Sequence, residues 1–380
     1  MRRAGGVVLV FFFLLLAAAC GGDDESEDAD DTDGSASASA PSPSEDDTED
    51  DADFGPLTEL LATLPDDGDN AAFVIVNDLD AAREANGIDD LDDDASEDEV
   101  VDNLLALTIR AEGVAPLVSE FAGGATVEQG AREDEIGFHF GHVDSDVVTG
   151  LPPEQLQVVV GDVDPDTIED AVASDPIWSD VLEEDEVDGV TVYSWLDDGE
   201  TDFDRISETH PLGESARLAV LSDDRVAWAR SDDVLEPLLD GEDSLAERDD
   251  LAELASVLEG ADAVSAMFSA EVAEGGPPDG FAPYEAFAVG GGVNDDGEPL
   301  LHVALWHEDE SDAEENVDEL EDYAEAAEDS RLWPEVIPVD VEQEGRVVLG
   351  TFRVQEPSAW SRLAFIGDPL LRYETDESVG

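Results

Sequence analysis

The sequence predicts an α+β fold in which antiparallel sheets carry helices packed on one face. Short apolar runs bounded by Gly, Pro, Asn and Asp recur along residues 54–380, as is typical of strands. Between them lie amphipathic stretches whose apolar residues are three and four positions apart, as on one face of a helix. Several of the expected strands are separated by only a few turn residues, and such hairpins indicate antiparallel pairing.

The expected strands follow one another along the folded region and alternate with turn signals. A hairpin is expected around Ser222, Asp223 and Asp224, and a run of three glycines at 290–292 indicates a bulge or a close backbone contact within a strand. The strands are expected at residues 73–76, 156–160, 190–195, 217–221, 225–229, 264–268, 286–289, 301–306, 336–341 and 347–354.

Three helices have clear signals of their own. Pro165 occupies a favourable first helical position, and the residues after it share an apolar face. Residues 251–258 form an amphipathic helix, and Ser311 with Glu314 forms a capping box that should open another.

Two stretches of the folded region resemble each other in the order of their elements. Each runs from a strand to a helix, then to a tryptophan, a glycine and a further strand, with Trp178 and Trp333 155 residues apart and Gly189 and Gly345 156 apart. We expect a duplicated α+β unit, about 130–260 and 261–375. A chance likeness stays open, because strand–helix–strand orders are common.

The first nineteen residues have the layout of a secretory signal peptide. Arg2 and Arg3 form a positive start, residues 7–19 are apolar, and small residues close the run. The alternative is a membrane anchor that stays attached, but a spanning helix needs about 20 apolar residues.

Cys20 is the single cysteine, so it has no partner for an intramolecular disulfide. The residues Leu16-Ala17-Ala18-Ala19-Cys20 resemble the lipobox of bacterial lipoproteins, although leucine usually stands at the position of Ala17. The resemblance implies cleavage after residue 19 and a lipidated Cys20, carrying acyl chains such as palmitate. It places the protein on the extracytoplasmic face of the cell membrane, in the cell envelope.

Residues 20–53 are expected to form a disordered acidic linker behind the lipidated cysteine. From residue 21 to 53 there are fifteen acidic residues, no basic one, and alanine as the only apolar type. Such a segment cannot bury enough apolar surface to offset the entropy of ordering. A spacer is favoured, and a cation-binding polyelectrolyte is the alternative.

The folded region is itself strongly acidic. The whole chain has a net charge of −87, and residues 54–380 still hold 87 acidic residues against 13 arginines. Such a surface repels itself at low ionic strength, and about 1 M salt screens that repulsion. We therefore predict a halophilic protein. Nucleic acid is excluded as a partner, because no basic patch exists to displace its counterions.

One block of residues is similar to a recurrent block in uncharacterised actinobacterial lipoproteins of unknown function. The resemblance implies a fold and a cellular address but no chemistry. It rests on residues 222–224, 228–231, 244–246, 249–250 and 263–267.

The five histidines are interpreted as structural or surface residues. His139 and His142 lie in an expected strand, where their odd spacing would place them on opposite faces. His302 and His307 meet the same objection, and His210 precedes a proline in a loop. Zinc sites need three or four convergent ligands, so no metal and no cofactor is predicted.

Other candidate sites are equally weak. The dense acidic run 89–99 could bind divalent cations weakly, although a solvated acidic surface is favoured. No nucleophile elbow, phosphate-binding loop or zinc-protease motif is present, so no catalytic residue is assigned. The six tryptophans are expected to pack in the core, with a ligand-lining role as the alternative.

The sequence is compatible with three functions. The favoured one is a non-enzymatic binding or interaction module, anchored to the membrane in a high-salt environment. The others are an envelope hydrolase that uses dispersed carboxylates with a divalent cation, and a carrier of an apolar or lipid ligand. A carrier requires a large apolar cavity.

Overall fold

Alternating residues of each strand enter two hydrophobic cores, one on either face of a single sheet. In the strand β1 (Val74–Asp78), Val74 and Val76 belong to one core and Ile75 to the other, as the two-residue period of a strand requires. The computed structural model describes residues 55–66, 70–89, 91, 95–123, 129–151, 153–241, 243–272, 277–278, 280–326, 336–366 and 370–371. The signal peptide, Cys20, the linker and Trp333 lie outside these residues.

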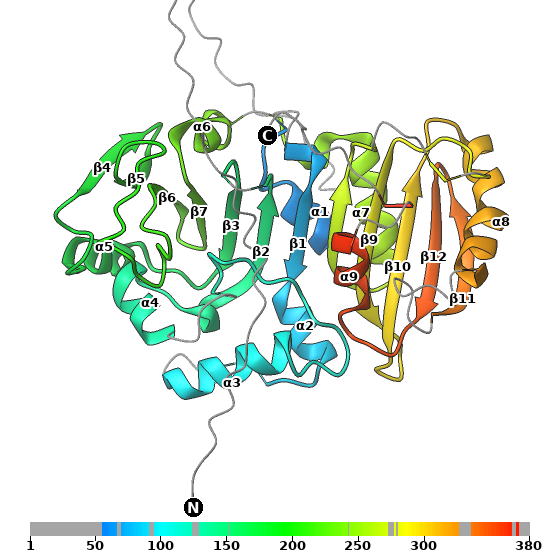
Figure 1. Cartoon of the computed structure of the whole chain (residues 1–380), viewed down its shortest axis with the longest axis horizontal. Coiled ribbons are helices and arrows are strands. Elements are labelled where there is room, and N and C mark those ends of the chain that lie inside the picture. The colour runs from blue at the N-terminus through cyan, green and yellow to red at the C-terminus, as the bar shows by residue number, and fades with distance from the viewer. Residues whose placement is uncertain are drawn as a thin grey trace, which may run out of the picture. The chain divides into compact units, whose positions relative to one another are not determined.

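The sheet has twelve strands, and every neighbouring pair is antiparallel (Figure 1). Its spatial order is β11-β12-β10-β9-β8-β1-β2-β3-β7-β6-β5-β4. The strands after β1 are β2 (Val143–Thr149), β3 (Leu156–Gly161), β4 (Leu182–Val187), β5 (Val190–Trp195), β6 (Ala216–Ser222), β7 (Arg225–Ala229), β8 (Ala263–Ser269), β9 (Ala286–Val293), β10 (Pro299–Trp306), β11 (Ile337–Glu344) and β12 (Val347–Arg353).

The two halves of the sheet follow the same connectivity. In the first half, β1, β2 and β3 form a meander, a helix follows, and the last strand of the next meander, β7, returns to pair with β3. In the second half, β8, β9 and β10 form the meander, and β12 returns to β10 after a helix. The halves join where β1 pairs with β8. This shared connectivity begins at β1, ahead of residue 130. Gene duplication itself stays a prediction.

Helices cover both faces of the sheet. One core is closed by α2 (Leu79–Ala85), α3 (Glu97–Thr108), α4 (Gln129–Ile136), α5 (Pro165–Ser174), α8 (Glu310–Ala326) and α9 (Ala359–Ile366). The other core is closed by α1 (Pro56–Leu61), α6 (Asp232–Asp240), α7 (Asp249–Gly260) and the short 3-10 turn η3 (Leu245–Glu247). None of the described helices is long and apolar enough to cross a membrane.

The α+β class and the antiparallel sheet are confirmed, but the helices pack on both faces rather than on one. The physical reason is the composition of the strands. Their residues are apolar on both sides of the pleat, as in β9, where nearly every residue is buried. A sheet with two apolar faces must be covered twice.

Local rules place several elements where the sequence predicts them. β5 spans Val190–Trp195, and its hairpin with β4 turns through Asp188 and Gly189, both in the left-handed region (φ 49° and 90°). Pro165 is the first residue of α5. The capping-box prediction at Ser311 is wrong: α8 begins at Glu310, so Ser311 lies inside the helix.

The glycine run at 290–292 is confirmed as a close backbone approach within β9. A Cβ atom on Gly291 would lie 2.4 Å from the indole ring of Trp360 on α9. The register of β8 against β9 also shifts between Ala263 and Ser265, opposite this run. The missing side chains therefore let α9 lie directly on the sheet.

Candidate functional site

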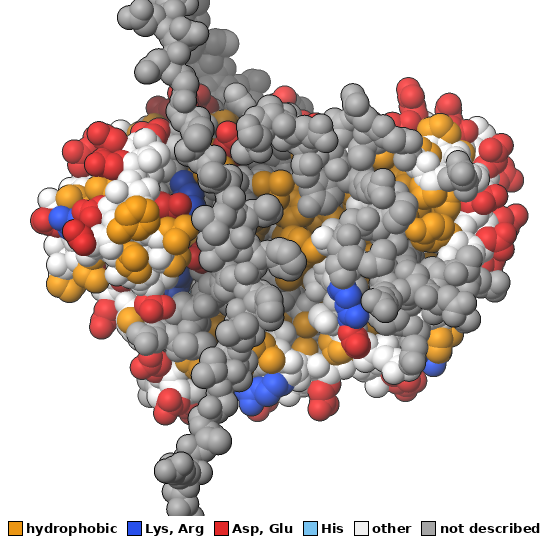
Figure 2. All heavy atoms as spheres, viewed as in Figure 1, with side chains coloured by type: hydrophobic (Ala, Val, Ile, Leu, Met, Phe, Trp, Pro, Cys, Tyr) orange, Lys and Arg blue, Asp and Glu red, His pale blue; other side chains and the backbone are white. Residues whose placement is uncertain are grey.

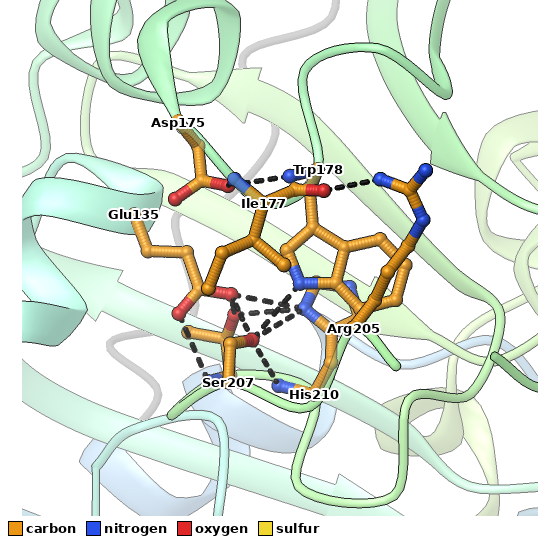
Figure 3. Close-up of polar contacts among 8 residues, drawn as sticks. Glu135, Asp175, Ile177, Trp178, Arg205, Ser207 and His210 are labelled. Atoms are coloured by element: carbon orange, nitrogen blue, oxygen red, sulfur yellow. Dashed lines mark hydrogen bonds and ion pairs between the residues drawn. The ribbon is translucent and has the colours of Figure 1, made fainter. Parts of the chain in front are cut away.

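A buried acid–imidazole pair lies beneath the first half of the sheet. Glu135 ends a buried stripe of α4, and His210 comes from the loop between β5 and β6. His210 Nδ1 lies 3.1 Å from Glu135 Oε1, and the two side chains point toward each other in Figure 3. Ser207 Oγ donates to the same oxygen at 2.5 Å, and Thr209 N donates to Oε2 at 3.2 Å. The Glu135 carboxylate thus holds three residues of one loop turn.

Glu135 is the charged centre of this network. Burial raises the pKa of its carboxyl, but hydrogen bonds from His210, Ser207 and Thr209 outweigh that effect and hold the pKa below the ordinary value. Glu135 is therefore ionised at neutral pH, and it can accept several hydrogen bonds at once.

The His210 ring is enclosed by aromatic side chains. Its centroid lies 4.2 Å from the Trp178 ring, 5.3 Å from Trp195 and 5.2 Å from Trp228. The indole of Trp178 is itself fixed by Ser207, whose Oγ accepts from Trp178 Nε1 at 3.0 Å. With Nδ1 directed at Glu135, the other ring nitrogen, Nε2, is buried and has no hydrogen-bond partner among the described residues.

Arg132 lies one helical turn before Glu135 on α4 and is almost completely buried. Its guanidinium carbon is 5.5 Å from the centre of the Phe121 ring and 5.2 Å from that of Phe138, at cation–π distance. Nε and Nη2 have no hydrogen-bond partner in the part of the chain that the structure describes. Burial lowers the pKa of Arg132 to about 10, against the opposing effect of Glu135 and other carboxylates. The guanidinium therefore stays charged at neutral pH.

A small cavity of about 30 Å³ lies between these groups. It has room for two or three water molecules, since a water needs about 10–15 Å³ on this measure. Its lining includes Phe121, Arg132, Gln157, His210, Trp228 and Arg230.

A wider hollow of about 340 Å³ shares three of the cavity's lining residues, Glu214, Ser215 and Arg230. Arg230 and Glu214 form an ion pair. This pair therefore stands between the inner cavity and the outer hollow.

The arrangement is not a serine–histidine–acid triad. In such a triad the carboxylate binds one ring nitrogen and the nucleophile faces the other. Here Ser207 Oγ is 3.5 Å from His210 Nδ1, on the same side as Glu135. Ser207 is also occupied by Trp178 and Glu135. The geometry is suited to holding a polar group rather than to activating this hydroxyl.

The remaining histidines are placed as follows. The interpretation of residues 138–142 as a strand is wrong, because Phe140–His142 forms a 3-10 turn, η2. Side chains three apart in such a turn eclipse, so the rings of His139 and His142 stack at 4.0 Å instead of lying on opposite faces. Burial, followed by the effect of His142, lowers the pKa of His139 to about 4.

His302 and His307 are buried in the second half of the sheet. Burial lowers the pKa of His302 to about 4. His307 is paired at both nitrogens: Nδ1 lies 3.0 Å from the Arg346 carbonyl oxygen and Nε2 lies 2.7 Å from Asn316 Nδ2. No group of three or more His, Cys, Asp or Glu residues that could hold a metal occurs among the described residues. The acidic run 89–99 lies partly outside them, and within it Ser96 and Glu99 cap α3.

The largest of the described hollows is an open groove of about 660 Å³ between α7, the start of α8 and the β11–β12 turn. Glu253, Glu308, Glu310, Glu344 and Arg346 are among its lining residues. A charged groove of this kind does not suit an apolar ligand. The described tryptophans are buried, as expected of core residues.

Sequence reasoning did not single out Glu135 or Arg132. The available signal was a stripe on α4, where Gln129, Arg132, Glu135 and Ile136 are buried at helical spacing. Glu135 is one of 102 acidic residues, and no sequence pattern distinguishes it from the others. Its partner His210 is 75 positions away and is brought to it by the packing of α4 under the β5–β6 loop.

Comparison with known proteins adds little. No known family and no curated protein matches the chain. Two solved structures, described as crystal forms IV and III of TP0453, align with 82% and 80% of this chain and with 98% and 97% of theirs. The sequence identities are 11% and 9%, and both TM-scores are 0.39. A likeness of this size carries no argument about function.

Proposed function

We propose that this chain is a lipid-anchored binding protein on the extracytoplasmic face of the cell membrane, built to work in concentrated salt. The observation that carries the proposal is the single cysteine, Cys20, which directly follows an apolar, small-residue segment and precedes a polar one. Acyl chains on its thiol would contribute about 0.8 kcal/mol for each buried CH₂ group.

The segment after Cys20 supports an anchored location. Residues 21–53 contain no basic residue, and their only apolar side chains are those of alanine and of Pro41 and Pro43. As a self-repelling coil of this length, the segment would hold the sheet roughly 30 Å or more from the bilayer.

The surface of the folded region supports work in high salt. Figure 2 shows acidic side chains crowded at both ends of the sheet. At one end Glu183, Glu184, Asp185 and Glu186 of β4 are all exposed, and at the other Asp340, Glu342 and Glu344 of β11 are exposed. Screening by salt shortens the range of the repulsion among such charges.

Binding is favoured over the two other functions. The largest of the described hollows is lined largely by charged side chains, which is the opposite of what a carrier of apolar ligands requires. For a hydrolase, the hydroxyl nearest to the buried imidazole, that of Thr209, lies 2.9 Å from Nδ1 and also binds Glu135. Neither observation favours a second proposal.

The anchor is tested by replacing the thiol. Cys20→Ser should move the protein from the membrane fraction to the medium, whereas the neighbouring control Ser26→Ala should stay membrane-bound. Intact-mass spectrometry of the wild type should show a chain that begins at Cys20 and carries acyl chains. An unmodified chain, or a Cys20→Ser variant that stays with the membrane, would refute the proposal.

The salt dependence is tested by thermal unfolding in 0.1 M and 2 M NaCl. We expect the melting temperature to rise with salt, because the repulsion among surface carboxylates falls as the Debye length shrinks to about 3 Å near 1 M. An unchanged or lower melting temperature at 2 M would contradict the halophilic part of the proposal.

A further inference from the structure

We propose that the cavity between Arg132 and His210 binds the carboxylate group of a small organic acid. The inference goes beyond the proposed function and does not depend on where the protein is anchored. It rests on two buried donor atoms of Arg132 without partners, on the geometry of the arginine edge, and on the hollow that continues the cavity outward.

Most of the polar side chains around the cavity already have hydrogen-bond partners. Both polar atoms of the Gln157 amide have a partner, since Oε1 accepts from Phe121 N at 2.9 Å and Nε2 donates to Gln155 Oε1 at 3.1 Å. Ser215 is engaged by the Arg230 carbonyl oxygen and by Gly199 N. Within the described part of the chain, Arg132 Nε, Arg132 Nη2 and His210 Nε2 have no such partner.

Unpaired buried polar groups are costly, and a buried charged group more so. The rings of Phe121 and Phe138, both at cation–π distance from the guanidinium, offset part of this cost. They do not accept the two N–H bonds in the plane of the guanidinium. An occupant that accepts both would remove the remaining cost.

The unpaired edge of Arg132 has the shape of a carboxylate-binding site. Nε–H and one Nη–H of arginine are parallel donors in one plane, and this spacing matches the two oxygens of a carboxylate. A divalent cation is disfavoured here, because the same edge presents positive charge. Glu120 and Glu214 also line the cavity, but Glu214 is already paired with Arg230.

The volume of the cavity limits the size of the ligand. The cavity of about 30 Å³ admits little more than a carboxylate group. The rest of an acid would occupy the adjoining hollow of about 340 Å³, past the Arg230–Glu214 pair. The ligand class is therefore a compact monocarboxylate whose head enters the cavity and whose short tail stays outside.

The test uses the tryptophans that surround the site as reporters. The full-length protein is titrated with sodium formate, acetate and propionate at constant ionic strength in sodium sulfate. Tryptophan fluorescence and calorimetry are recorded, and sodium chloride is titrated separately. We expect a saturable response to the carboxylates and a higher melting temperature in their presence, since a ligand that binds only the folded state stabilises it.

Two variants locate the response. Arg132→Met removes the donor edge while keeping an apolar chain of similar length between the phenylalanines, and it should weaken acetate binding about tenfold or more. Arg205→Gln is the matched control, because Arg205 also lies over a site tryptophan, at 6.0 Å from the Trp178 ring, but is bound by Asp180. It should bind acetate as the wild type does.

Arg132→Lys keeps the charge without the parallel donors and serves if Arg132→Met does not fold. It should also weaken acetate binding. The proposal is overturned if no carboxylate binds, which would mean a cavity filled by water. It is equally overturned if chloride alone gives the response, or if the response to acetate persists in both Arg132 variants.

Discussion

The two halves of the sheet share one connectivity but bury different polar chemistry. In the second half, His307 is closed off, because one ring nitrogen faces a backbone carbonyl oxygen and the other faces Asn316. In the first half, His210 is held by Glu135 on one side only, and its second nitrogen faces a cavity beside Arg132. Burial of a histidine is common to both. What distinguishes the candidate site is that several buried polar atoms without partners lie together there beside a cavity.

The buried polar groups of the two halves also do different things. The Asn316–His307 pair fastens the segment at Ala282 to α8, since Asn316 donates to the Ala282 carbonyl and accepts from its N–H. The Glu135 network also holds a loop in place, but a cavity lies next to it. The following predictions test how far the halves differ.

The largest effect is expected in the first half, from Glu135→Ala. The change leaves His210, Ser207 and Thr209 without their common acceptor and takes a nearby negative charge from Arg132. Removing one partner of a buried charged pair typically lowers the free energy of unfolding by about 3–5 kcal/mol. Chemical denaturation measures it. Glu133→Ala on the same helix is the control, because Glu133 is exposed, and an equal loss in both variants would contradict the network's role.

The pH dependence of stability should carry opposite contributions from the two halves. Burial raises the pKa of Asp146, on β2, to about 6 and lowers that of His302, on β10, to about 4. Between pH 4 and 6 the folded state holds a proton on Asp146 that the unfolded state has lost. In the same pH range His302 is unprotonated in the folded state, whereas a histidine in the unfolded state keeps its proton up to about pH 6.5. Rising pH therefore lowers the free energy of unfolding through Asp146 and raises it through His302, by about 3 kcal/mol each.

Variants separate these two contributions. Asp146→Asn should make the free energy of unfolding rise more steeply between pH 4 and 6, and His302→Phe should make it rise less steeply. Urea denaturation at several pH values in 2 M NaCl provides the measurement. Slopes that do not move, or that both move in one direction, would contradict the assignment.

A smaller effect is expected in the second half, from Asn316→Leu. The substitution leaves His307 Nε2 and the Ala282 backbone groups unpaired, so the free energy of unfolding should fall by about 1–3 kcal/mol. The double variant Asn316→Leu with His307→Leu should lose less than the sum of the single variants, because neither partner is then left alone. A loss as large as that of Glu135→Ala would remove the contrast between the halves.

The smallest effect is expected at the rim of the first half's network, from Arg205→Gln. Arg205 binds Asp180 and Asp202 at the surface, where solvent and salt weaken ion pairs. The melting temperature in 2 M NaCl should stay close to that of the wild type. A large fall would show that the network extends to the surface.

Much of the fold could be predicted because local rules fix it. The strand Val190–Trp195 and the turn at Asp188-Gly189 follow from alternation and backbone conformation. The sequence does not predict β4, because its residues Glu183, Glu184, Asp185 and Glu186 are acidic and lie at an exposed sheet edge, where no apolar pattern is required. The 3-10 turn at Phe140–His142 was mistaken for a strand, because its apolar and polar residues alternate by coincidence.

The site could not be predicted, for a different reason. Its atoms come from α4 and from the β5–β6 loop, and no local pattern connects them. The property that marks them, a missing hydrogen-bond partner, exists only after packing. Sequence can place His210 beside Pro211, but it cannot show which of 102 acidic residues will meet the imidazole.

The acidic border strands have a consequence for assembly. An open sheet can grow when another copy adds its own border strand, with backbones about 4.8 Å apart. At β4 and β11 such growth would bring rows of carboxylates face to face, which opposes end-to-end polymerisation in dilute buffer. Concentrated salt weakens this repulsion between carboxylates, and at the same time it stabilises the folded chain. We therefore expect that the salt concentrations that best stabilise the folded monomer are also those at which end-to-end polymerisation is opposed least.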